Sequence, residues 1–397
     1  MTQIAITGNE TLALAMKQIN PDVVAAYPIT PQTEIVQLFS QFIADGEVET
    51  EFITVESEHS AMSAAVGASS AGVRAMTATS ANGLALMLEV VYIAASSRLP
   101  IVMPVINRAL SGPINIHCDH SDAMAVSNSG CIQIFGENAQ QAYDNLLQAV
   151  KIAENEEVRL PVMVNMDGFI ISHAVENVEI LTPEEVNTFI GEYNPDWSLL
   201  KSDKPGTLGP LDLQDYYFEH KRQQVEAMEK ARQVVKEVGE EYGHLSGRRY
   251  GYFDHYQLED AGIALIGMGS TMGTARVAVD NMRERGIKAG LLNLRLFRPL
   301  PTETLRKTLA GVPVIGVLDR ADSFSLGGGQ LFTDLRSILF NTDPEIRIVN
   351  YIYGLGGRDI TVSEIEGILF ELEKMRERRQ EDYSGEDMTV RYQGVRE

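Results

Sequence analysis

Three polar residues in the first half of the sequence each follow directly on a short apolar run. Thr30 lies in YPITP, Glu58 in VESEHS and Arg108 in INRALSGP. An arginine fork suits a carboxylate, a hydroxyl can donate a hydrogen bond to a carboxylate or carbonyl oxygen, and a carboxyl group can transfer a proton. If the fold brings these side chains together, they could bind a small acid and act on it as an acid or base.

Each of the three residues also has a purely structural explanation. Thr30 before Pro31 is typical of a helix N-cap followed by proline at the first helical position. Glu58 could complement the dipole at a helix start, and with Glu56 so close, one of the two carboxylates is expected to be solvated. Arg108 could be a surface residue in a loop. Local sequence leaves these alternatives open.

The apolar runs alternate with longer segments of helical pattern. Strands are expected at residues 22–27, 50–55, 73–79, 100–106 and 161–165, and helices at 31–42, 57–70, 83–97 and 139–154. This alternation is typical of a mostly parallel sheet that is covered by helices on both faces. Because ligands bind outside the carboxyl ends of such strands, Thr30, Glu58 and Arg108 are expected along one rim.

A second series of strands and helices begins near residue 260. Strands are expected at residues 263–267, 289–294, 314–318 and 346–351, and helices at 271–285, 302–309, 329–340 and 361–375. Successive βα units predict a second α/β domain of flavodoxin-like size. The segment between the two series is punctuated by proline and then highly charged, which predicts a connector with a long helix at 215–242. The expected division is a first domain at 1–180, the connector at 181–255, a second domain at 256–380 and a mixed-charge tail at 381–397.

Composition narrows the possible function classes. The formal net charge of -22 argues against nucleic-acid binding, because a phosphate backbone requires a cationic face. No signal-peptide pattern and no run of about 18 or more apolar residues is found, so we expect a cytoplasmic protein without a membrane span. The two cysteines, Cys118 and Cys131, cannot form a four-thiolate iron–sulfur cluster, and a disulfide between them is not expected in a reducing compartment.

Longer stretches of the sequence resemble a known family. The runs AYPITPQTEIV, VESEHSAMSAAVGASSAG, LPIVMPVINRALSGPINI and LPVMVNMDGFIISH are similar to the alpha-type subunit of pyruvate:ferredoxin oxidoreductases and related 2-oxoacid:ferredoxin oxidoreductases. The resemblance continues through MGSTMGTA, LRLFRPLP, VLDR and YGLGGRDIT, so it covers nearly the whole chain. It implies an α/β fold, with a thiamine-enzyme pyrimidine-binding-like domain followed by a transketolase C-terminal-like domain.

The resemblance also implies roles for individual residues. The family's glutamate in the S-E-x-x-A context matches Glu58, which is expected to hydrogen-bond N1′ of the aminopyrimidine of thiamine diphosphate and so promote proton removal from the thiazolium. The family's substrate-binding threonine and arginine match Thr30 and Arg108, which would orient a 2-oxoacid. Pro28 and Ile29, in the same YPITP run, are expected to contact the cofactor.

A missing segment indicates that other chains are needed. Thiamine enzymes hold the diphosphate and its metal ion with a Gly-Asp-Gly segment and an asparagine-containing loop, whereas the nearest match here, MDG at residues 166–168, lacks the first glycine and the loop. The diphosphate and Mg²⁺ are therefore expected on a beta-type partner chain. Iron–sulfur clusters are also expected on partner chains, which the resemblance implies to be gamma-type and ferredoxin-like delta-type subunits.

The implied reaction is the reversible oxidative decarboxylation of pyruvate with coenzyme A, which gives acetyl-CoA and CO2 and reduces ferredoxin. One alternative is the same chemistry on another 2-oxoacid, such as 2-oxoisovalerate or 2-oxoglutarate. A second alternative is a non-catalytic scaffold subunit, against which the retention of Thr30, Glu58 and Arg108 counts.

Two further motifs suggest other ligands. The GMGSTMG segment at residues 267–273 follows a predicted strand, but its glycine spacing and the lack of an acidic residue at the end of the next strand argue against NAD. The HCDHSD segment at 117–122 could ligate zinc, but no fourth ligand is evident, so no metal site is expected in this chain. Many members of the resembled family carry tryptophan in place of His117 and Cys131, which leaves the substrate side chain and the partner contact open.

Overall fold

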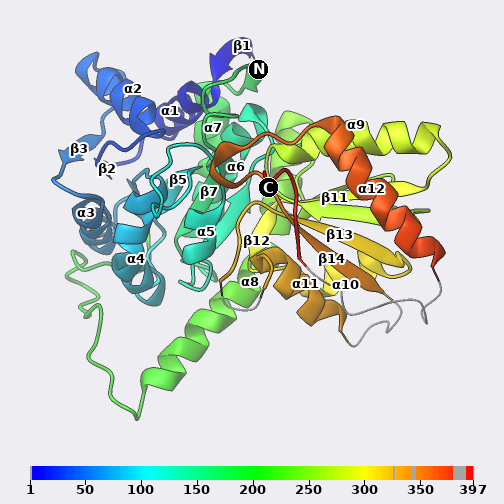
Figure 1. The fold of residues 1–397 in the computed structure, drawn as a ribbon. Helices are drawn as coiled ribbons and strands as arrows, with labels where there is room; N and C mark the ends of the chain where they lie inside the picture. The colour runs from blue at the N-terminus through cyan, green and yellow to red at the C-terminus, as the bar shows by residue number, and fades with distance from the viewer. Residues whose placement is uncertain (1, 325–326, 341–345, 379–389, 397) are drawn as a thin grey trace.

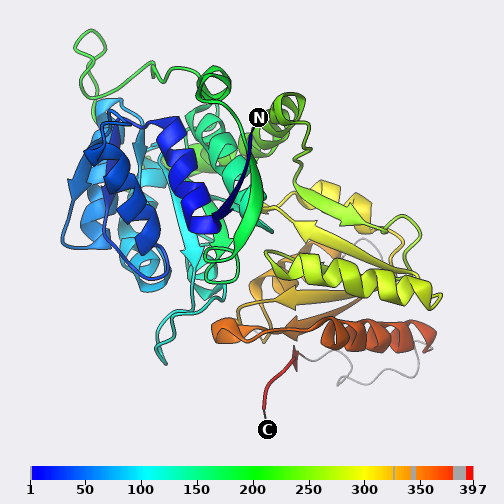
Figure 2. The ribbon, with the colours of Figure 1, turned by 90° about the horizontal axis from the view of Figure 1, so that it is seen from above.

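The computed structural model describes residues 2–324, 327–340, 346–378 and 390–396. The chain forms two α/β domains that lie side by side, each with a sheet between layers of helices (Figure 1, Figure 2). A separate two-stranded antiparallel sheet pairs β1 (Thr2–Thr7) with β8 (Val175–Ile180), at the two ends of the first domain. The α/β class expected from the sequence is confirmed.

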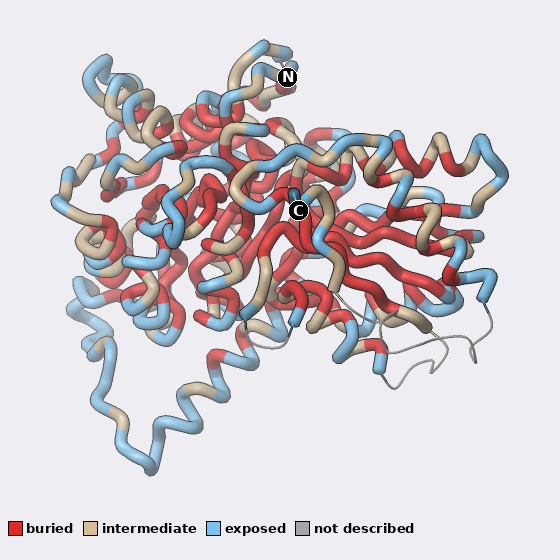
Figure 3. The backbone as a smooth tube through the Cα atoms, in the orientation of Figure 1, coloured by how far each residue is buried: buried red, intermediate tan, exposed pale blue. Residues whose placement is uncertain are grey.

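The sheet of the first domain carries the expected rim. Its strand order is β12-β6-β7-β5-β4-β2-β3, and every neighbouring pair is parallel except β12 with β6. The parallel strands are β2 (Val23–Ala26), β3 (Glu51–Thr54), β4 (Ala75–Met76), β5 (Val102–Asn107), β6 (Ile132–Phe135) and β7 (Val162–Asp167). The central strands β5, β6 and β7 are wholly buried, as strands covered on both faces require (Figure 3).

Helices cover both faces of this sheet. Buried residues of α1 (Gly8–Ile19), α2 (Thr33–Ala44) and α6 (Ala139–Glu154) pack together on one face, and those of α3 (Glu58–Ala71) and α4 (Ala81–Ser96) pack on the other. A short helix, α5 (Ser121–Ala125), follows the loop that leaves β5. The helices after β2, β3 and β4 therefore begin at the same edge of the sheet at which these strands end.

The starts of α2 and α3 test the structural explanations that local sequence left open for Thr30 and Glu58. The N-cap position of α2 is Gln32, so Thr30 is not an N-cap and Pro31 is not the first helical residue. Helix α3 begins at Glu58, with Ser57 as its side-chain cap. The capping explanation for Thr30 is therefore wrong, whereas Glu58 does lie at the positive end of a helix dipole.

The second domain has a six-stranded sheet in the order β15-β14-β13-β10-β11-β9. Its strands are β9 (Phe253–Tyr256), β10 (Ile263–Gly267), β11 (Ala289–Leu294), β13 (Val314–Asp319), β14 (Arg347–Ile352) and β15 (Arg391–Tyr392). Helices α9 (Thr271–Glu284) and α12 (Val362–Glu377) pack on one face, and α10 (Thr302–Leu309) and α11 (Gln330–Leu339) pack on the other. The strand β9 crosses the boundary expected between connector and second domain at residues 255–256, and β15 lies within the expected tail, of which residues 381–389 and 397 are outside the described residues.

One strand crosses from the second half of the chain to the first domain. Strand β12 (Leu296–Arg298), in the LRLFRPLP run, pairs antiparallel with β6. Next to it, the buried Arg295 donates to Asn145 Oδ1 at 2.7 Å and to Gln148 Oε1 at 2.9 Å, both on α6. Burial lowers the pKa of Arg295 to about 10, so it stays charged while it fixes the crossing. The LRLFRPLP run therefore joins the two domains.

The connector contains α7 (Pro183–Ile190) and the 30-residue helix α8 (Tyr217–Ser246). The later turns of α8 pack on α6 through the buried Ala231, Val234 and Val238, while its first turns extend away from the two domains (Figure 1). The described part of the chain contains no helix with enough length and apolar character to span a membrane.

Candidate functional site

Thr30 and Arg108 meet at the rim of the first sheet. Arg108 directly follows β5, and its Nη1 donates to the backbone oxygen of Thr30 at 2.8 Å. Its Nε donates to the backbone oxygen of Asn115 at 2.8 Å. Thr30 itself is exposed, so its hydroxyl is accessible beside the guanidinium.

The Arg108 guanidinium is buried but only partly satisfied. The side chain belongs to a residue that is 7% exposed, and within the described residues its Nη2 has no hydrogen-bond partner. Burial lowers the pKa of Arg108, and the charge of the nearby Asp122 opposes this shift. A guanidinium that is held by two backbone oxygens and keeps free N–H groups is suited to bind a carboxylate ligand.

The buried carboxylate of Asp122, on α5, joins two parts of the rim. Its Oδ2 accepts from the backbone N–H of Ala81 and from that of Arg108, both at 3.0 Å. Its Oδ1 accepts from Asn107 Nδ2 at 3.0 Å and from the Ala123 N–H at 2.7 Å. Burial raises the pKa of Asp122 to about 6, against these donors. Asp122 thereby fixes the start of α4 to the end of β5.

We expect Asp122→Ala to lower the free energy of unfolding by at least ~1–3 kcal/mol, because it leaves buried donors unpaired. Urea unfolding of the chain measures this effect. Asp122→Asn, which keeps an acceptor oxygen, should lie between the wild type and Asp122→Ala. Wild-type stability in Asp122→Ala would contradict the anchoring role.

Glu58 presents a buried carboxylate that nothing in the described chain neutralises. The residue is 7% exposed, and within the described residues its carboxylate has neither a hydrogen bond nor an ion pair. It lies so close to α4 that a Cβ on Gly83 would be 2.7 Å from Glu58 Oε1. The neighbouring Glu56 is exposed and accepts a hydrogen bond from Ser60 Oγ, so Glu56 is the solvated member of the pair.

The YPITP loop is tied to the same region by a residue that sequence reasoning missed. Gln32 is fully buried; its Oε1 accepts from the Ile29 N–H at 3.2 Å, and its Nε2 donates to the Ala78 backbone oxygen at 3.1 Å. Pro28 is exposed and Ile29 is half-buried, so both can contact a ligand at the rim. A single glutamine after a proline carries no pattern that would have revealed this role.

The loop after Arg108 is held against the second domain. Asn115, whose backbone oxygen accepts from Arg108, donates through Nδ2 to the Gly356 backbone oxygen at 3.0 Å. The Gly356 N–H in turn donates to Asp119 Oδ2 at 3.2 Å. Gly356 has a φ of 60°, and a Cβ there would lie 2.5 Å from Asn115 Nδ2. The YGLGGRDIT run therefore helps to orient Arg108 from the second domain.

A buried cluster around Asp167 joins the two domains. Asp167 Oδ1 lies 2.8 Å from His120 Nε2, while Oδ2 accepts from Ser270 Oγ at 2.6 Å, from the Ser270 N–H at 3.1 Å and from Arg320 Nη1 at 3.1 Å. Burial alone would raise the pKa of Asp167, but His120, the charge of Arg320 and the Ser270 hydroxyl together hold it below its usual range.

The Asp167 cluster occupies positions where the sequence motifs suggest a nucleotide, a metal ion at a diphosphate or a zinc ion. The N-terminus of α9, after the GMGSTMG turn, already receives the Asp167 carboxylate in place of a nucleotide phosphate, and Gly269 has a φ of 77° beside it. The same carboxylate is the aspartate of the MDG segment, so it is not free to bind a metal ion at a diphosphate. His120, Asp167 and the buried Cys118 have ligand atoms within 4.8 Å of one another, but a cation among them would meet the charge of Arg320. His117, the other histidine of the HCDHSD segment, instead packs on Phe169 with ring centroids 4.9 Å apart.

Comparison with known proteins identifies the family. Residues 14–240 match the family described as "Pyruvate flavodoxin/ferredoxin oxidoreductase, thiamine diP-bdg", and residues 261–365 match "Pyruvate:ferredoxin oxidoreductase core domain II". The chain is 57% identical to the pyruvate synthase subunit PorA of Thermotoga maritima, over 91% of this chain and 92% of that protein. The chain belongs to the pyruvate:ferredoxin oxidoreductase family.

Other relatives and solved structures agree with this family and fold. The ketoisovalerate oxidoreductase subunit VorA of Pyrococcus abyssi is 42% identical over 93% of each chain. A solved 2-oxoglutarate:ferredoxin oxidoreductase from Magnetococcus marinus has a TM-score of 0.71 at 20% identity and covers 93% of this chain and 65% of its own. A split-gene transketolase has a TM-score of 0.56 at 14% identity, over 94% of this chain and 100% of its own. These two structures support the fold alone.

The first domain of this oxidoreductase-family chain is a thiamine diphosphate-binding domain, and its rim fits the aminopyrimidine end of that cofactor. Glu58 offers a carboxylate that has no partner among the described residues, and the hydroxyl of the fully buried Thr79, which lies against the same Gly83, has none either. A pyrimidine nitrogen that shares a proton with a carboxylate would satisfy such a group. Asp167 of the MDG segment is engaged between the domains by Ser270 and Arg320.

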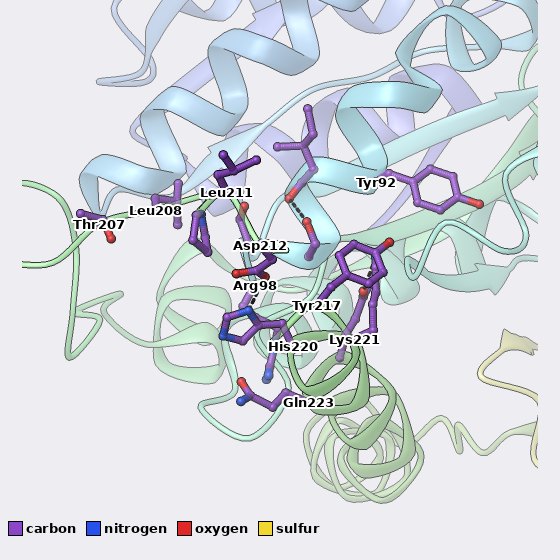
Figure 4. Close-up of a pocket in the computed structure, with 16 residues that line it drawn as sticks. Tyr92, Arg98, Thr207, Leu208, Leu211, Asp212, Tyr217, His220, Lys221 and Gln223 are labelled. Carbon is purple, nitrogen blue, oxygen red and sulfur yellow. Dashed lines mark hydrogen bonds and ion pairs between the residues drawn. The ribbon is translucent and has the colours of Figure 1, made fainter. Parts of the chain in front are cut away.

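A cavity of about 680 Å³ lies between the end of α4, the connector and the start of α8 (Figure 4). It is lined by Tyr92 near the end of α4, by Leu208 and Leu211 of the connector, and by Tyr217 and His220 at the start of α8. The rim residues lie at the opposite end of α4, whose 16 residues span ~24 Å. This cavity is therefore separate from the rim residues.

Proposed function

We propose that this chain is the subunit of a pyruvate:ferredoxin oxidoreductase that supplies the groups for substrate binding and for activation of the aminopyrimidine. The observation that carries the proposal is the unpartnered, buried carboxylate of Glu58 at the same rim as the partly free guanidinium of Arg108. The 57% identity to a pyruvate synthase subunit supports pyruvate as the substrate.

In this proposal, each rim residue has a defined task. Bound thiamine diphosphate supplies the nucleophilic carbon and the electron sink that decarboxylation of a 2-oxoacid requires. Glu58 is the catalytic residue and holds a proton between its carboxylate and N1′ of the aminopyrimidine. Arg108 binds the substrate carboxylate through its free N–H groups, and the Thr30 hydroxyl donates to a substrate oxygen. Pro28 and Ile29 contact the cofactor at the exposed end of the YPITP loop.

The remaining parts of the enzyme are proposed to lie on partner chains. A beta-type subunit would bind the diphosphate and Mg²⁺, and gamma-type and ferredoxin-like delta-type subunits would complete the complex that passes electrons to ferredoxin. Support comes from the two cysteines, which are too few for a cluster, and from the engagement of Asp167 between the domains. We propose no metal site in this chain, coenzyme A as second substrate, and the cytoplasm as location.

We propose the domain division given by the sequence. The pairing of two strands favours a shift of two of its boundaries. The first domain is placed at residues 1–180, the connector at 181–255, the second domain at 256–380 and the tail at 381–397. Since β9 pairs with β11 and β15 pairs with β14, both belong to the sheet of the second domain.

A comparison of acids tests the substrate. The assembled complex, purified without oxygen, should reduce a redox dye with a higher kcat/KM for pyruvate than for 2-oxoisovalerate or 2-oxoglutarate. Because one methylene is worth only ~1–3 kcal/mol in a small pocket, the discrimination is expected to be about 10- to 200-fold. A higher kcat/KM for 2-oxoisovalerate would favour the alternative acid, in keeping with the 42% identical ketoisovalerate subunit. No activity on any of the acids would favour a scaffold role.

Arg108→Lys is expected to raise the KM for pyruvate roughly 10- to 100-fold with a smaller effect on kcat, because an ammonium cannot bind both backbone oxygens and a carboxylate in the same fork geometry. Steady-state kinetics at saturating cofactor measure this. Arg98→Lys is a matched control, since Arg98 also donates to backbone oxygens but lines the distant cavity. An unchanged KM in Arg108→Lys would contradict the assigned role.

A further inference from the structure

Two oxygen atoms without partners converge on one point of helix α4. Thr79 is fully buried, and its Oγ1 has no hydrogen-bond partner among the described residues. A Cβ added to Gly83 would lie 2.5 Å from Thr79 Oγ1 and 2.7 Å from Glu58 Oε1. Both side chains therefore lie against the backbone of α4 at Gly83, which has no side chain, on the side where Glu58 begins α3.

The backbone of Thr79 is fixed in register with β5. Its N–H donates to the Pro104 oxygen at 3.1 Å, and its oxygen accepts from the Ile106 N–H at 3.0 Å. The next residue, Ser80, donates through Oγ to the Ile106 oxygen. These bonds fix the backbone of Thr79, and a buried hydroxyl left without a partner costs about 1–3 kcal/mol. The polar atoms nearest to an added Cβ on Gly83 are Thr79 Oγ1 and Glu58 Oε1.

We propose that Thr79 is a positioning residue for Glu58. No hydrogen bond joins the two side chains in this structure, but both lie against Gly83, so a rotation of the Glu58 side chain would let the Thr79 hydroxyl donate to its carboxylate, and Gly83 is needed for that approach. A carboxylate only accepts, and a threonine hydroxyl can donate. A fixed donor on one carboxylate oxygen sets the direction of the other, which is the oxygen that must face the aminopyrimidine. The inference rests on the proposed role of Glu58 and adds residues to which no role has been given.

Two substitutions at residue 79 separate a hydrogen-bonding role from a packing role. Thr79→Val keeps the shape and removes the hydroxyl, whereas Thr79→Ser keeps the hydroxyl and removes a methyl group. We expect Thr79→Val to lower kcat for pyruvate-dependent dye reduction roughly 10- to 100-fold, the loss of a hydrogen bond to a charged group, and to weaken thiamine diphosphate binding. Thr79→Ser should retain kcat within about threefold, although its thermal stability should fall. The reverse order, with an active Val variant and an inactive Ser variant, would overturn the proposal.

The chain offers a chemically identical control for Thr79→Val. Thr77 is also fully buried with an unpartnered hydroxyl, but it lies two residues earlier, ~7 Å further from the carboxyl end of the strand. Thr77→Val should leave kcat and cofactor affinity unchanged. Equal losses of kcat in Thr77→Val and Thr79→Val would overturn the proposal, because the effect would then follow from any change of a buried hydroxyl here.

Gly83→Ala tests the close approach independently of residue 79. The new Cβ would displace Thr79 Oγ1 and Glu58 Oε1, so kcat and thiamine diphosphate affinity should fall at least as far as in Thr79→Val. Gly67→Ala, in the middle of α3 with nothing within 4 Å of an added Cβ, is the matched control and should be neutral or slightly stabilising. Wild-type cofactor affinity in Gly83→Ala would overturn the inference.

A parallel measurement of Glu58→Gln distinguishes the two levels of the argument. If Glu58→Gln is inactive while Thr79→Val and Gly83→Ala behave as wild type, the positioning inference fails and the proposed function stands. If Glu58→Gln is itself active, the proposed function fails, and the inference that rests on it fails as well.

Discussion

Replacing Glu58 with glutamine is expected to reduce pyruvate-dependent dye reduction by the assembled complex roughly 10²–10⁴-fold, the usual contribution of a positioned acid–base group. Glutamine keeps the size of the side chain and its place at the start of α3, but it cannot hold a proton for the aminopyrimidine nitrogen. The effect should therefore appear in kcat at saturating pyruvate and cofactor, while the fold is retained.

Glu56→Gln is the control for this experiment. Glu56 has the same chemical group two residues away, but it is exposed and bonded to Ser60, so its substitution should change kcat less than twofold. Thermal unfolding of both variants should confirm that neither is destabilised by more than about 1 kcal/mol. Wild-type activity in Glu58→Gln would refute the catalytic role, and equal losses in both variants would indicate a general effect of acidic charge at this helix start.

The rim could be predicted because the position of each of its residues follows from the strand and helix patterns next to it in the sequence. Thr30, Glu58 and Arg108 each follow a Val- or Ile-rich run that is followed by a helical pattern, and parallel strands place their carboxyl ends at one edge. Several element bounds agree closely, such as α6 at Ala139–Glu154 and β11 at Ala289–Leu294.

What could not be predicted depends on contacts between residues that are far apart in sequence. The N-cap expectation for Thr30 failed because the chain turns once more before α2, so that Gln32 can tie the loop to Ala78. The role of Asp122 could not be predicted for the same reason, since its partners Ala81 and Arg108 lie on two different elements. Strand β12 was missed because its three residues pair with a sheet built from the other half of the chain.

The contacts made by the family motifs in the second half of the chain are revealed only by the structure. Ser270 of MGSTMGTA and Arg320 of VLDR both donate to Asp167, while Gly356 of YGLGGRDIT contacts Asn115. All three motifs therefore contact the first domain, and Gly356 contacts the loop whose Asn115 backbone oxygen holds Arg108. The second domain thus helps to fix that loop.

Asp167→Ala is consequently expected to destabilise the chain more than any of the other substitutions proposed for it. It would leave the Arg320 guanidinium, whose side chain is 3% exposed, without its carboxylate, and it would remove the acceptor of His120 and Ser270. Breaking a buried pair by removing one partner costs about 3–5 kcal/mol. The free energy of unfolding, measured by urea titration of the chain, should fall by that amount.

A double-mutant cycle shows whether this loss arises from the abandoned charge. Asp167→Ala/Arg320→Met removes both charges and should recover a substantial part of the lost stability, because apolar replacement of a whole buried pair is often nearly neutral. Asp254→Ala, which breaks an ion pair with Arg276 at 2.8 Å where the Asp254 side chain is 60% exposed, should cost only ~0–1 kcal/mol. If Asp167→Ala were no more costly than Asp254→Ala, the cluster would not hold the domains together. The recovered double variant should still have a raised KM for pyruvate, because restored stability does not restore the hydrogen bonds that hold His120 and the Arg108 loop in place.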